Sequence, residues 1–260
     1  SGIFFDSPDL AFFKQCYVTG ILGGATLNPP SLKKAGVTNV EEHFKKMVGI
    51  VEKPFPISVE IPDTNWPEEK MVELGIRYHE AFPENAVIKV PMDPSDPLKA
   101  FKVIKELGQN HVRTNATLGL TAGQLISASE AGRFSNANGD NYVSLFWGRR
   151  EEAKLELITK EEDIIDNNLS QNSYYEKDYK RQMARSLRTV LITDASQTLT
   201  TALEYLRMHN LDTKIIVGSI RRPYQIERAF GLGADIVTIP PEILSEWMQT
   251  KRGEDTAEEF

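Results

Sequence analysis

The stretch Ala86–Gly108, AVIKVPMDPSDPLKAFKVIKELG, contains one strand-and-helix unit and sets the pattern for the whole chain. Its start, Ala86–Val90, is a short apolar run, which is typical of a strand buried on both faces. Its second half has apolar residues at helical spacing from Leu98 to Leu107, and the pattern stops at Gly108 as it would at a helix C-cap. A strand followed by such a helix favours a parallel sheet covered by helices.

The same alternation recurs along most of the chain. Helical spacing also marks residues 40–51, 71–82 and 199–206, and Pro67 and Pro223 stand where first-turn prolines are tolerated. The strand candidates are Gly2–Phe5, Leu22–Thr26, Ile57–Ile61, Ala86–Val90, Val112–Thr117, Tyr142–Trp147, Lys214–Gly218 and Asp235–Ile239. Eight such strands predict an α/β fold of the closed (β/α)8 TIM-barrel type. An open doubly wound sheet is the alternative, but the turn after Phe5 reads Asp-Ser-Pro-Asp and lacks the Gly-rich phosphate fingerprint.

Two segments interrupt this rhythm. Residues 151–188 are polar and longer than an ordinary connection, so we expect an insertion after the sixth strand, either a lid or a local helix. Thr189–Thr193 reads as extended and could belong to that insertion. Residues 251–260 form a charged tail that we expect to be mobile. We therefore predict one domain, a barrel over residues 1–250 that carries the insertion, followed by the tail.

Composition limits the classes of function. Of 260 residues, 40% are hydrophobic and 26% charged, which is ordinary for a soluble globular protein. A net charge of −7 argues against broad nucleic-acid binding but permits a small anionic ligand held by a few cations. Cys16 is the only cysteine, which excludes an intramolecular disulfide and suits the cytoplasm. No apolar run is long enough for a membrane span, and the first residues do not resemble a secretory signal.

Polar side chains gather at the predicted strand ends. The carboxyl ends of barrel strands carry the functional residues of this fold. The residues at these places are Asp6, Thr26, Asn28, Glu60, Lys89, Asn115, Thr117, Ser144, Arg149, Ser219 and Arg221. Their occurrence at corresponding ends of successive strands favours an enzyme over unrelated structural roles.

Lys89 interrupts a strand that is otherwise apolar. Burial disfavours the ammonium, lowers a lysine's pKa and favours the neutral amine that attacks carbonyl groups. The alternative is a lysine whose stem packs inside while its head group reaches solvent at the rim of the barrel. From the strand pattern alone both interpretations stay open.

The other residues also have structural interpretations. Asp6 and Glu60 could pair with Lys89 or with strand-end amides, because buried carboxylates are usually paired. Asn28, before two prolines, fits ordinary turn chemistry. Thr117 and Ser144 could fill the barrel, and the pairs Arg149-Arg150 and Arg221-Arg222 could be solvated. Yet basic pairs after strands six and seven would meet on one side of the mouth, where barrels build phosphate sites.

Five segments resemble one enzyme family. They are Gly24–Leu32 (GATLNPPSL), Val87–Pro91 (VIKVP), Thr114–Thr117 (TNAT) with Gln124, Val143–Arg149 (VSLFWGR) and Gly218–Arg221 (GSIR). In order and placement they resemble the transaldolase family, which includes the small fructose-6-phosphate aldolases. The resemblance runs from about Ile3 to Leu244, apart from the insertion. Leu27, Pro30 and Trp147 depart from the family pattern.

The resemblance implies a role for each matching position. Lys89 would form the Schiff base, Asp6 would shuttle protons, and Glu60 with Thr117 would hold a catalytic water. Hydroxyl groups of the dihydroxyacetone moiety would be positioned by Asn28, Asn115 and Ser144, with support from Thr26. The phosphate would be clamped by Arg149, Ser219 and Arg221. Glu60 and Phe146 resemble the transaldolase branch, because the small aldolases carry Gln and Tyr there.

The expected activity is therefore a class I transaldolase of carbohydrate metabolism, as in the pentose phosphate pathway. It would move a dihydroxyacetone unit from a ketose phosphate to an aldose acceptor through a Lys89 imine. No cofactor or metal is expected, since His43, His79, His111 and His209 fall in predicted helices or connections. A lyase that releases free dihydroxyacetone, or a sugar-phosphate-binding barrel without turnover, remain alternatives. The sequence leaves open the sugars, the role of the insertion and the oligomeric state; a homo-oligomer would be compatible with it.

Overall fold

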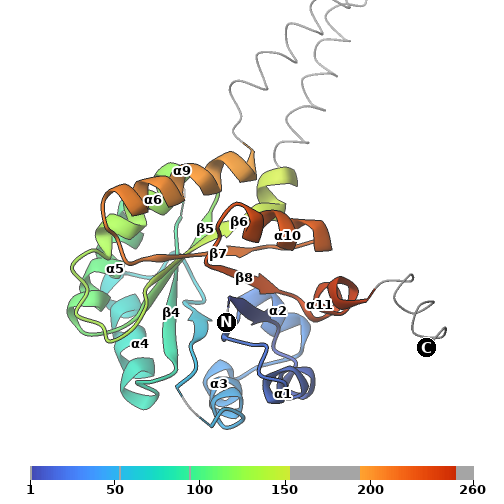
Figure 1. The fold of residues 1–260 in the computed structure, drawn as a ribbon. Helices are drawn as coiled ribbons and strands as arrows, with labels where there is room; N and C mark the ends of the chain where they lie inside the picture. Colours follow the sequence, from blue (N-terminus) through green and yellow to red (C-terminus); the bar gives the residue numbers. More distant parts are fainter. Residues whose placement is uncertain (1, 53, 94, 153–193, 250–260) are drawn as a thin grey trace, which may run out of the picture.

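The computed structural model describes residues 2–249 except 53, 94 and 153–193 (Figure 1). The predicted tail, Thr189–Thr193 and all but the first two residues of the predicted insertion therefore lie outside the described residues.

The described residues form a closed barrel of parallel strands. The strands are β1 (Ile3–Asp6), β2 (Gly24–Thr26), β3 (Ile57–Glu60), β4 (Ala86–Pro91), β5 (Thr114–Gly119), β6 (Tyr142–Phe146), β7 (Lys214–Gly218) and β8 (Ile236–Ile239). Each strand pairs with the next in sequence, and β8 pairs in parallel with β1. The predicted (β/α)8 barrel is confirmed, and closure excludes the open doubly wound sheet.

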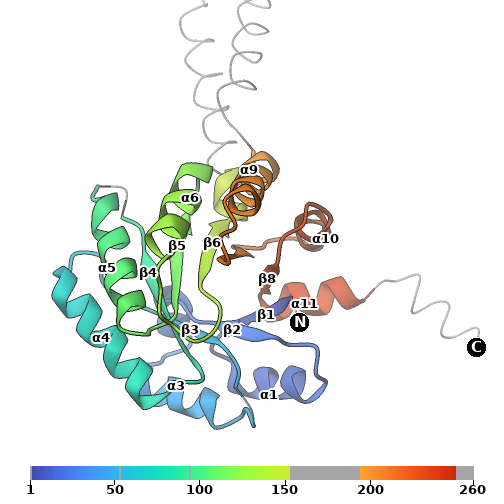
Figure 2. The ribbon, with the colours of Figure 1, turned by 60° about the vertical axis from the view of Figure 1, so that its left-hand side comes forward.

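The helices cover the outside of the barrel (Figures 1 and 2). They are α1 (Leu10–Val18), α2 (Pro29–Lys34), α3 (Val40–Val48), α4 (Glu68–Ala81), α5 (Pro97–Gln109), α6 (Ala122–Ala131), α9 (Ala195–Met208), α10 (Pro223–Gly231) and α11 (Pro241–Met248). Side chains cap the starts of several of them: Asp9 accepts two backbone N–H groups of α1, and Thr121 with Gln124 forms a capping box on α6. Every predicted helical segment is confirmed.

Alternate residues of each strand face opposite sides of the sheet and build two cores. Outward-facing residues such as Phe5, Ile88 and Val217 pack against the helices in the main hydrophobic cluster. A smaller cluster of Phe4, Val87, Tyr142, Ile216 and Ile236 fills the amino-terminal part of the barrel interior. Phe4 and Tyr142 meet edge to face, with ring centroids 5.9 Å apart.

The next inward positions toward the carboxyl ends are polar. They are Asp6, Thr26, Glu60, Lys89, Asn115, Ser144 and Thr238, and all of them except Asn115 stand two residues after an inward-facing position of the same strand. The interior therefore changes from an apolar plug to a polar floor along the barrel axis. This arrangement places the polar side chains toward the carboxyl ends of the strands, inside the barrel.

Several predicted boundaries are wrong by a residue or more. The helix α5 does not end at Gly108 but continues to Gln109, with Asn110 as C-cap, and the left-handed residue is His111 at φ 64°. Gly108 is favoured there because a Cβ atom would lie 3.0 Å from Cβ of Ser135. The sixth strand ends at Phe146, because residues 147–152 are helical.

The fifth strand also differs from the prediction. It begins at Thr114 and runs past Thr117 to Gly119, because a bulge shifts its register against β6 between Ala116 and Gly119. Leu118, at the bulge, has φ 66°, which is uncommon for a residue with a side chain. Bulges of this kind frequently re-aim side chains next to active sites.

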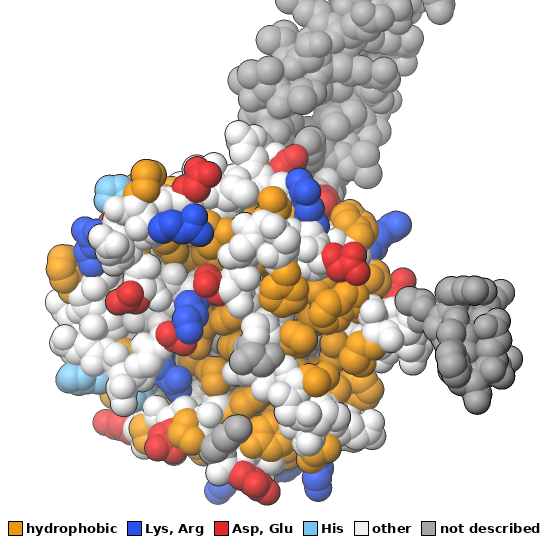
Figure 3. Space-filling model, viewed as in Figure 1, with side chains coloured by type: hydrophobic (Ala, Val, Ile, Leu, Met, Phe, Trp, Pro, Cys, Tyr) orange, Lys and Arg blue, Asp and Glu red, His pale blue; other side chains and the backbone are white. Residues whose placement is uncertain are grey.

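The surface shows no single-sign face in the view of Figure 3, where basic side chains lie among acidic ones. Hydrophobic side chains gather toward the lower right of the same view. None of the helices in the described part of the chain is long and apolar enough to cross a bilayer.

Candidate active site

A cavity of about 240 Å³ lies at the carboxyl ends of the strands. It is lined by Asp6, Thr26, Asn28, Pro30, Glu60, Lys89, Leu118, Ser144, Phe146, Arg149, Gly218, Ser219, Arg221 and Thr238. All predicted site residues line it except Asn115 and Thr117, which lie behind its wall. The structure therefore brings together predicted residues from β1, β2, β3, β4 and β6 and from the segments that follow β2, β6 and β7.

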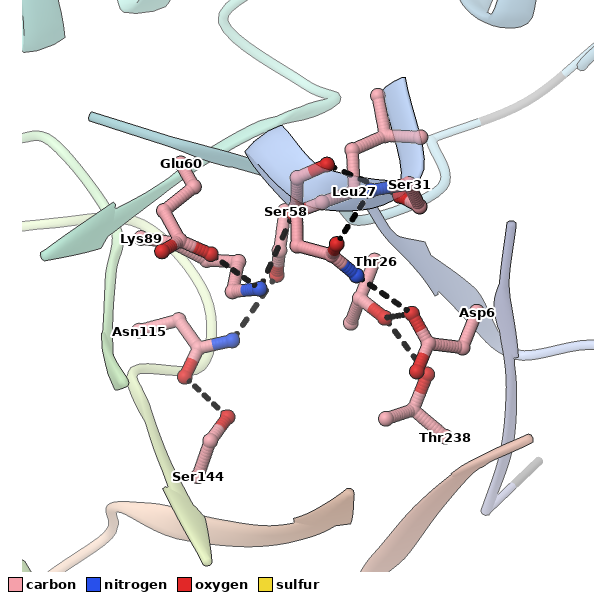
Figure 4. A network of polar contacts seen from close by, with 11 residues as sticks. Asp6, Thr26, Leu27, Ser31, Ser58, Glu60, Lys89, Asn115, Ser144 and Thr238 are labelled. Atoms are coloured by element: carbon pink, nitrogen blue, oxygen red, sulfur yellow. Dashed lines mark hydrogen bonds and ion pairs between the residues drawn. The ribbon is translucent and has the colours of Figure 1, made fainter. Parts of the chain in front are cut away.

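Lys89 is buried at the floor of this cavity. Strand register places Glu60 of β3 directly beside it, and Nζ of Lys89 lies 2.8 Å from Oε2 of Glu60. The ammonium also donates a hydrogen bond of 3.0 Å to the backbone carbonyl of Leu27 (Figure 4). Only 5% of the Lys89 side chain and 10% of the Glu60 side chain are exposed. The alternative in which the lysine head group reaches solvent at the rim is therefore wrong.

This environment suits a nucleophile that must be held in place. The carboxylate and the carbonyl fix Nζ at the end of a stiff strand, pointing across the polar floor (Figure 4). Nζ attacks a carbonyl carbon only after it gives up a proton, and Oε2 of Glu60 is an acceptor at hydrogen-bond distance. The arrangement couples a buried amine to a buried base.

Asp6 ends β1 on the opposite side of the floor. Its Oδ1 accepts hydrogen bonds from Oγ1 of Thr26 at 3.2 Å and from Nδ2 of Asn28 at 3.3 Å. Oγ1 of Thr26 also lies 2.7 Å from Oγ1 of Thr238. Burial raises the pKa of Asp6, although the charge of Lys89 and the Thr26 hydrogen bond oppose that shift. A carboxyl group with a raised pKa can exchange protons with a substrate nearer to neutral pH.

Asn28 both caps α2 and donates a hydrogen bond to Asp6. Its Oδ1 caps α2 by accepting the backbone N–H of Ser31 at 2.9 Å, which leaves Nδ2 directed at Asp6. The structural interpretation of Asn28 as turn chemistry is thus correct but incomplete, because the cap also orients the amide toward the cavity. The cap fixes the orientation that the site uses.

A second chain of hydrogen bonds crosses the floor beside Lys89. Asn115 pairs with Lys89 in register, and its Nδ2 donates to Oγ of Ser58 at 3.2 Å. Oγ of Ser144 donates to Oδ1 of Asn115 at 2.7 Å (Figure 4). Asn115 is fully buried and does not line the cavity, whereas Ser144 does. Asn115 therefore orients Ser144 from behind.

Thr117 is also fully buried and does not line the cavity. Its Oγ1 has no hydrogen-bond partner in the part of the chain that the structure describes. A buried hydroxyl without a protein partner is a place where an ordered water fits. The pairing of Thr117 with Glu60 through a water stays a prediction.

The basic side of the cavity is built by the segments that follow β6 and β7. The N–H of Gly148 donates to the carbonyl of Ser219 at 3.1 Å, and a Cβ atom at Gly148 would lie 2.2 Å from that oxygen. The close approach brings Arg149 and Arg221 to the same cavity, as predicted. Ser219 has φ 59°, and within the described residues its buried Oγ has no partner. Together these groups offer donors to an anion.

Sequence reasoning missed several residues of the site. Ser58 and Thr238 are polar residues inside otherwise apolar strands, and this interruption was the signal that would have found them. Leu118 was not detectable, because its position depends on the bulge. Glu152 follows Arg149 by one turn of helix, and its Oε2 lies 3.1 Å from a guanidinium nitrogen of Arg149.

Among the described residues no group of three or more His, Cys, Asp or Glu side chains is arranged to hold a metal ion.

The comparisons by sequence point to one family. Residues 3–260 match the family described as Transaldolase/Fructose-6-phosphate aldolase. A "Probable transaldolase" of Geobacillus thermodenitrificans is 30% identical over 243 residues, 94% of this chain and 88% of the relative. One from Syntrophobacter fumaroxidans is 26% identical over 94% of this chain and 87% of the relative. The structure of a putative phosphonomutase from Burkholderia cenocepacia matches 98% of this chain and 92% of the phosphonomutase chain, with a TM-score of 0.52. At 11% sequence identity this likeness shows the fold alone.

Proposed function

The chain belongs to the transaldolase/fructose-6-phosphate aldolase family, and from this we propose that it is a Schiff-base transaldolase. It transfers a dihydroxyacetone unit from a ketose phosphate to an aldose acceptor, with Lys89 as the nucleophile. One observation supports this proposal most: a buried lysine held by Glu60 and the Leu27 carbonyl, at the floor of a polar cavity.

The first half of the proposed reaction forms the imine. Nζ of Lys89 gives its proton to Glu60 and attacks the ketose C2 carbonyl to form a carbinolamine. The carbinolamine loses its hydroxyl group as water and becomes a protonated imine. A water between Glu60 and Thr117 would relay these protons, which would also give the unpartnered Oγ1 of Thr117 a hydrogen-bond partner. Asn28 and Ser144 would hold the substrate hydroxyl groups.

The second half breaks and remakes a carbon–carbon bond. Asp6 takes the proton from the C4 hydroxyl, the C3–C4 bond breaks, and its electron pair moves onto the protonated imine to give an enamine. The donor aldehyde leaves, and the enamine attacks the acceptor aldehyde while Asp6 returns the proton. The raised pKa of Asp6 supports this shuttle role. Hydrolysis of the new imine then frees Lys89.

The residue at position 146 favours transfer over release. Phe146 ends β6 and lines the cavity, and its ring has no proton to donate to the enamine. A phenol there could protonate the three-carbon unit and release free dihydroxyacetone. With Phe146 the enamine persists until an aldehyde arrives. The basic side of the cavity, with Arg149, Ser219 and Arg221, would bind the phosphate.

Incubation with fructose 6-phosphate, with and without erythrose 4-phosphate, tests the proposal. Glyceraldehyde 3-phosphate should accumulate only slowly without the acceptor and quickly with it, and free dihydroxyacetone should stay low in both. Equal release of dihydroxyacetone and of the aldehyde would identify a lyase instead. No product with either mixture, despite binding of the sugar, would favour a binding protein.

We also propose a role in the carbohydrate metabolism of the cytoplasm, as in the pentose phosphate pathway, with small sugar phosphates as its partners. A single buried cysteine and a negative net charge are in keeping with this. Fractionation of cells that express the tagged chain would test the location.

A further inference from the structure

An acidic side chain pairs with both arginines on the basic side of the cavity. Oε2 of Glu152 lies 3.1 Å from a terminal guanidinium nitrogen of Arg149, and Oε1 lies 3.4 Å from Nε of Arg221. One carboxylate therefore spans the two arginines, using one oxygen for each. All three side chains are partly exposed, between 43% and 64%, so the ion pairs lie at the solvent-facing mouth.

The helical turn that carries Glu152 is anchored through its neighbour Glu151. The carboxylate of Glu151 accepts hydrogen bonds from Nε1 of Trp147 at 2.7 Å and from Nε2 of Gln225 at 2.6 Å. The side chain of Gln225 is buried, and its Oε1 accepts the backbone N–H of Arg221 at 2.7 Å. The helix that carries Glu152 is thus tied to the segment that carries Arg221. These hydrogen bonds hold the segment with Glu152 beside the segment with Arg221.

A phosphate group would need the same donors. Arginine binds phosphate through paired N–H groups, and a carboxylate presents two oxygens to such groups in a similar way. Because the donors facing Glu152 are already used, a phosphate must either displace the carboxylate or bind beside it. Displacement breaks the two ion pairs of Glu152, and binding beside it brings two anions together, so both cases cost free energy.

We propose that Glu152 is a specificity-determining residue that competes with a substrate phosphate for Arg149 and Arg221. This proposal rests on the proposed function. With Glu152 in place, the site discriminates less between phosphorylated and unphosphorylated sugars than it would with the two arginines alone. A sugar whose far end carries only hydroxyl groups suits the combined site, because hydroxyls accept from guanidinium groups and donate to a carboxylate.

The size of the effect follows from the charges. Two unit charges about 4 Å apart in a water-like medium repel by an energy that corresponds to about a fivefold change in affinity. A phosphate carries about 1.5 to 2 negative charges at neutral pH, so removal of the Glu152 charge should tighten phosphate binding by about tenfold. The effect should shrink as salt is added, because the mouth is exposed.

The test compares the unmodified protein with Glu152→Gln and with a charge-matched control, Glu227→Gln. Glu227 is exposed on α10, so its substitution removes the same charge without touching the pair of arginines that Glu152 spans. Inorganic phosphate binding is measured by calorimetry at two salt concentrations. The Michaelis constants and turnover numbers for fructose 6-phosphate and for fructose are measured in parallel.

Glu152→Gln should bind phosphate about tenfold more tightly, and Glu227→Gln should not change the affinity. The Michaelis constant for fructose 6-phosphate should fall, whereas the constant for fructose, which loses a carboxylate acceptor, should not fall. Unchanged or weaker phosphate binding in Glu152→Gln, or an equal gain in Glu227→Gln, would overturn the inference. The calorimetry needs no turnover, so a failure of the proposed activity would leave this result interpretable.

Discussion

Substitution of Lys89 by Met should destabilise the fold by leaving Glu60 without its partner. The charged atoms lie 2.8 Å apart, and the two side chains are only 5% and 10% exposed, so both groups are largely desolvated although they line the cavity. Met is similar in length to Lys and apolar, so packing changes little. Breaking a buried ion pair by removing one partner typically costs about 3–5 kcal/mol, because the remaining charge is buried and uncompensated. We expect a loss of that size at neutral pH.

The double variant Lys89→Met/Glu60→Gln separates this explanation from a packing defect. Removal of both charges should recover most of the lost stability, because replacement of a whole buried pair is often close to neutral. Urea unfolding of the parent, both single variants and the double variant gives the free energies of unfolding and the coupling energy. A double variant no more stable than Lys89→Met, or a loss below about 1 kcal/mol in Lys89→Met, would refute the account of a desolvated pair.

Three further predictions concern the cavity. Phe146→Tyr should raise the release of free dihydroxyacetone and lower the ratio of transfer to cleavage, because general acid–base assistance is typically worth about 10²–10⁴-fold in rate and the phenol should supply a measurable part of it. Glu60→Gln should add to this effect in a product assay. An unchanged ratio would count against the role of Phe146. Arg221→Ala should weaken phosphorylated donors by about 1.5 kcal/mol, the low end for a hydrogen bond to a charged group because the side chain is 47% exposed. Unphosphorylated donors should be weakened less, so equal losses in steady-state kinetics would indicate a structural role. Asp6→Asn should raise the melting temperature at pH 7, because the raised pKa of Asp6 means that its ionised form costs stability above the folded pKa. That gain should vanish below the unfolded pKa of about 3.9, and a gain that does not depend on pH would contradict the assignment.

The barrel could be predicted because short apolar strands and amphipathic helices alternate with a period that few folds share. The strand ends were less predictable. Nothing local in the sequence shows that β5 passes Thr117 through a bulge, since the register depends on β6. Gly108 looked like a helix C-cap, but the glycine there is explained by the close approach of Ser135, a residue from a distant part of the chain.

The candidate site could be predicted as a set of positions but not as a network. The sequence places Asp6, Lys89 and Ser144 at strand ends, and the structure adds which atoms they meet. The backbone carbonyl of Leu27, which accepts from Lys89, carries no side-chain signal at all. Glu152 had a signal in its spacing from Arg149, yet its bridge to Arg221 depends on how two connections approach each other.

The most direct test of the account is to trap the imine on Lys89. The protein is incubated with fructose 6-phosphate and borohydride, digested, and analysed by peptide mass spectrometry, with Lys89→Met as the control. The peptide containing Lys89 should gain the mass of a reduced dihydroxyacetone adduct, and Lys89→Met should gain none. An adduct on another lysine, or no adduct with any ketose or ketose phosphate, would contradict the central claim.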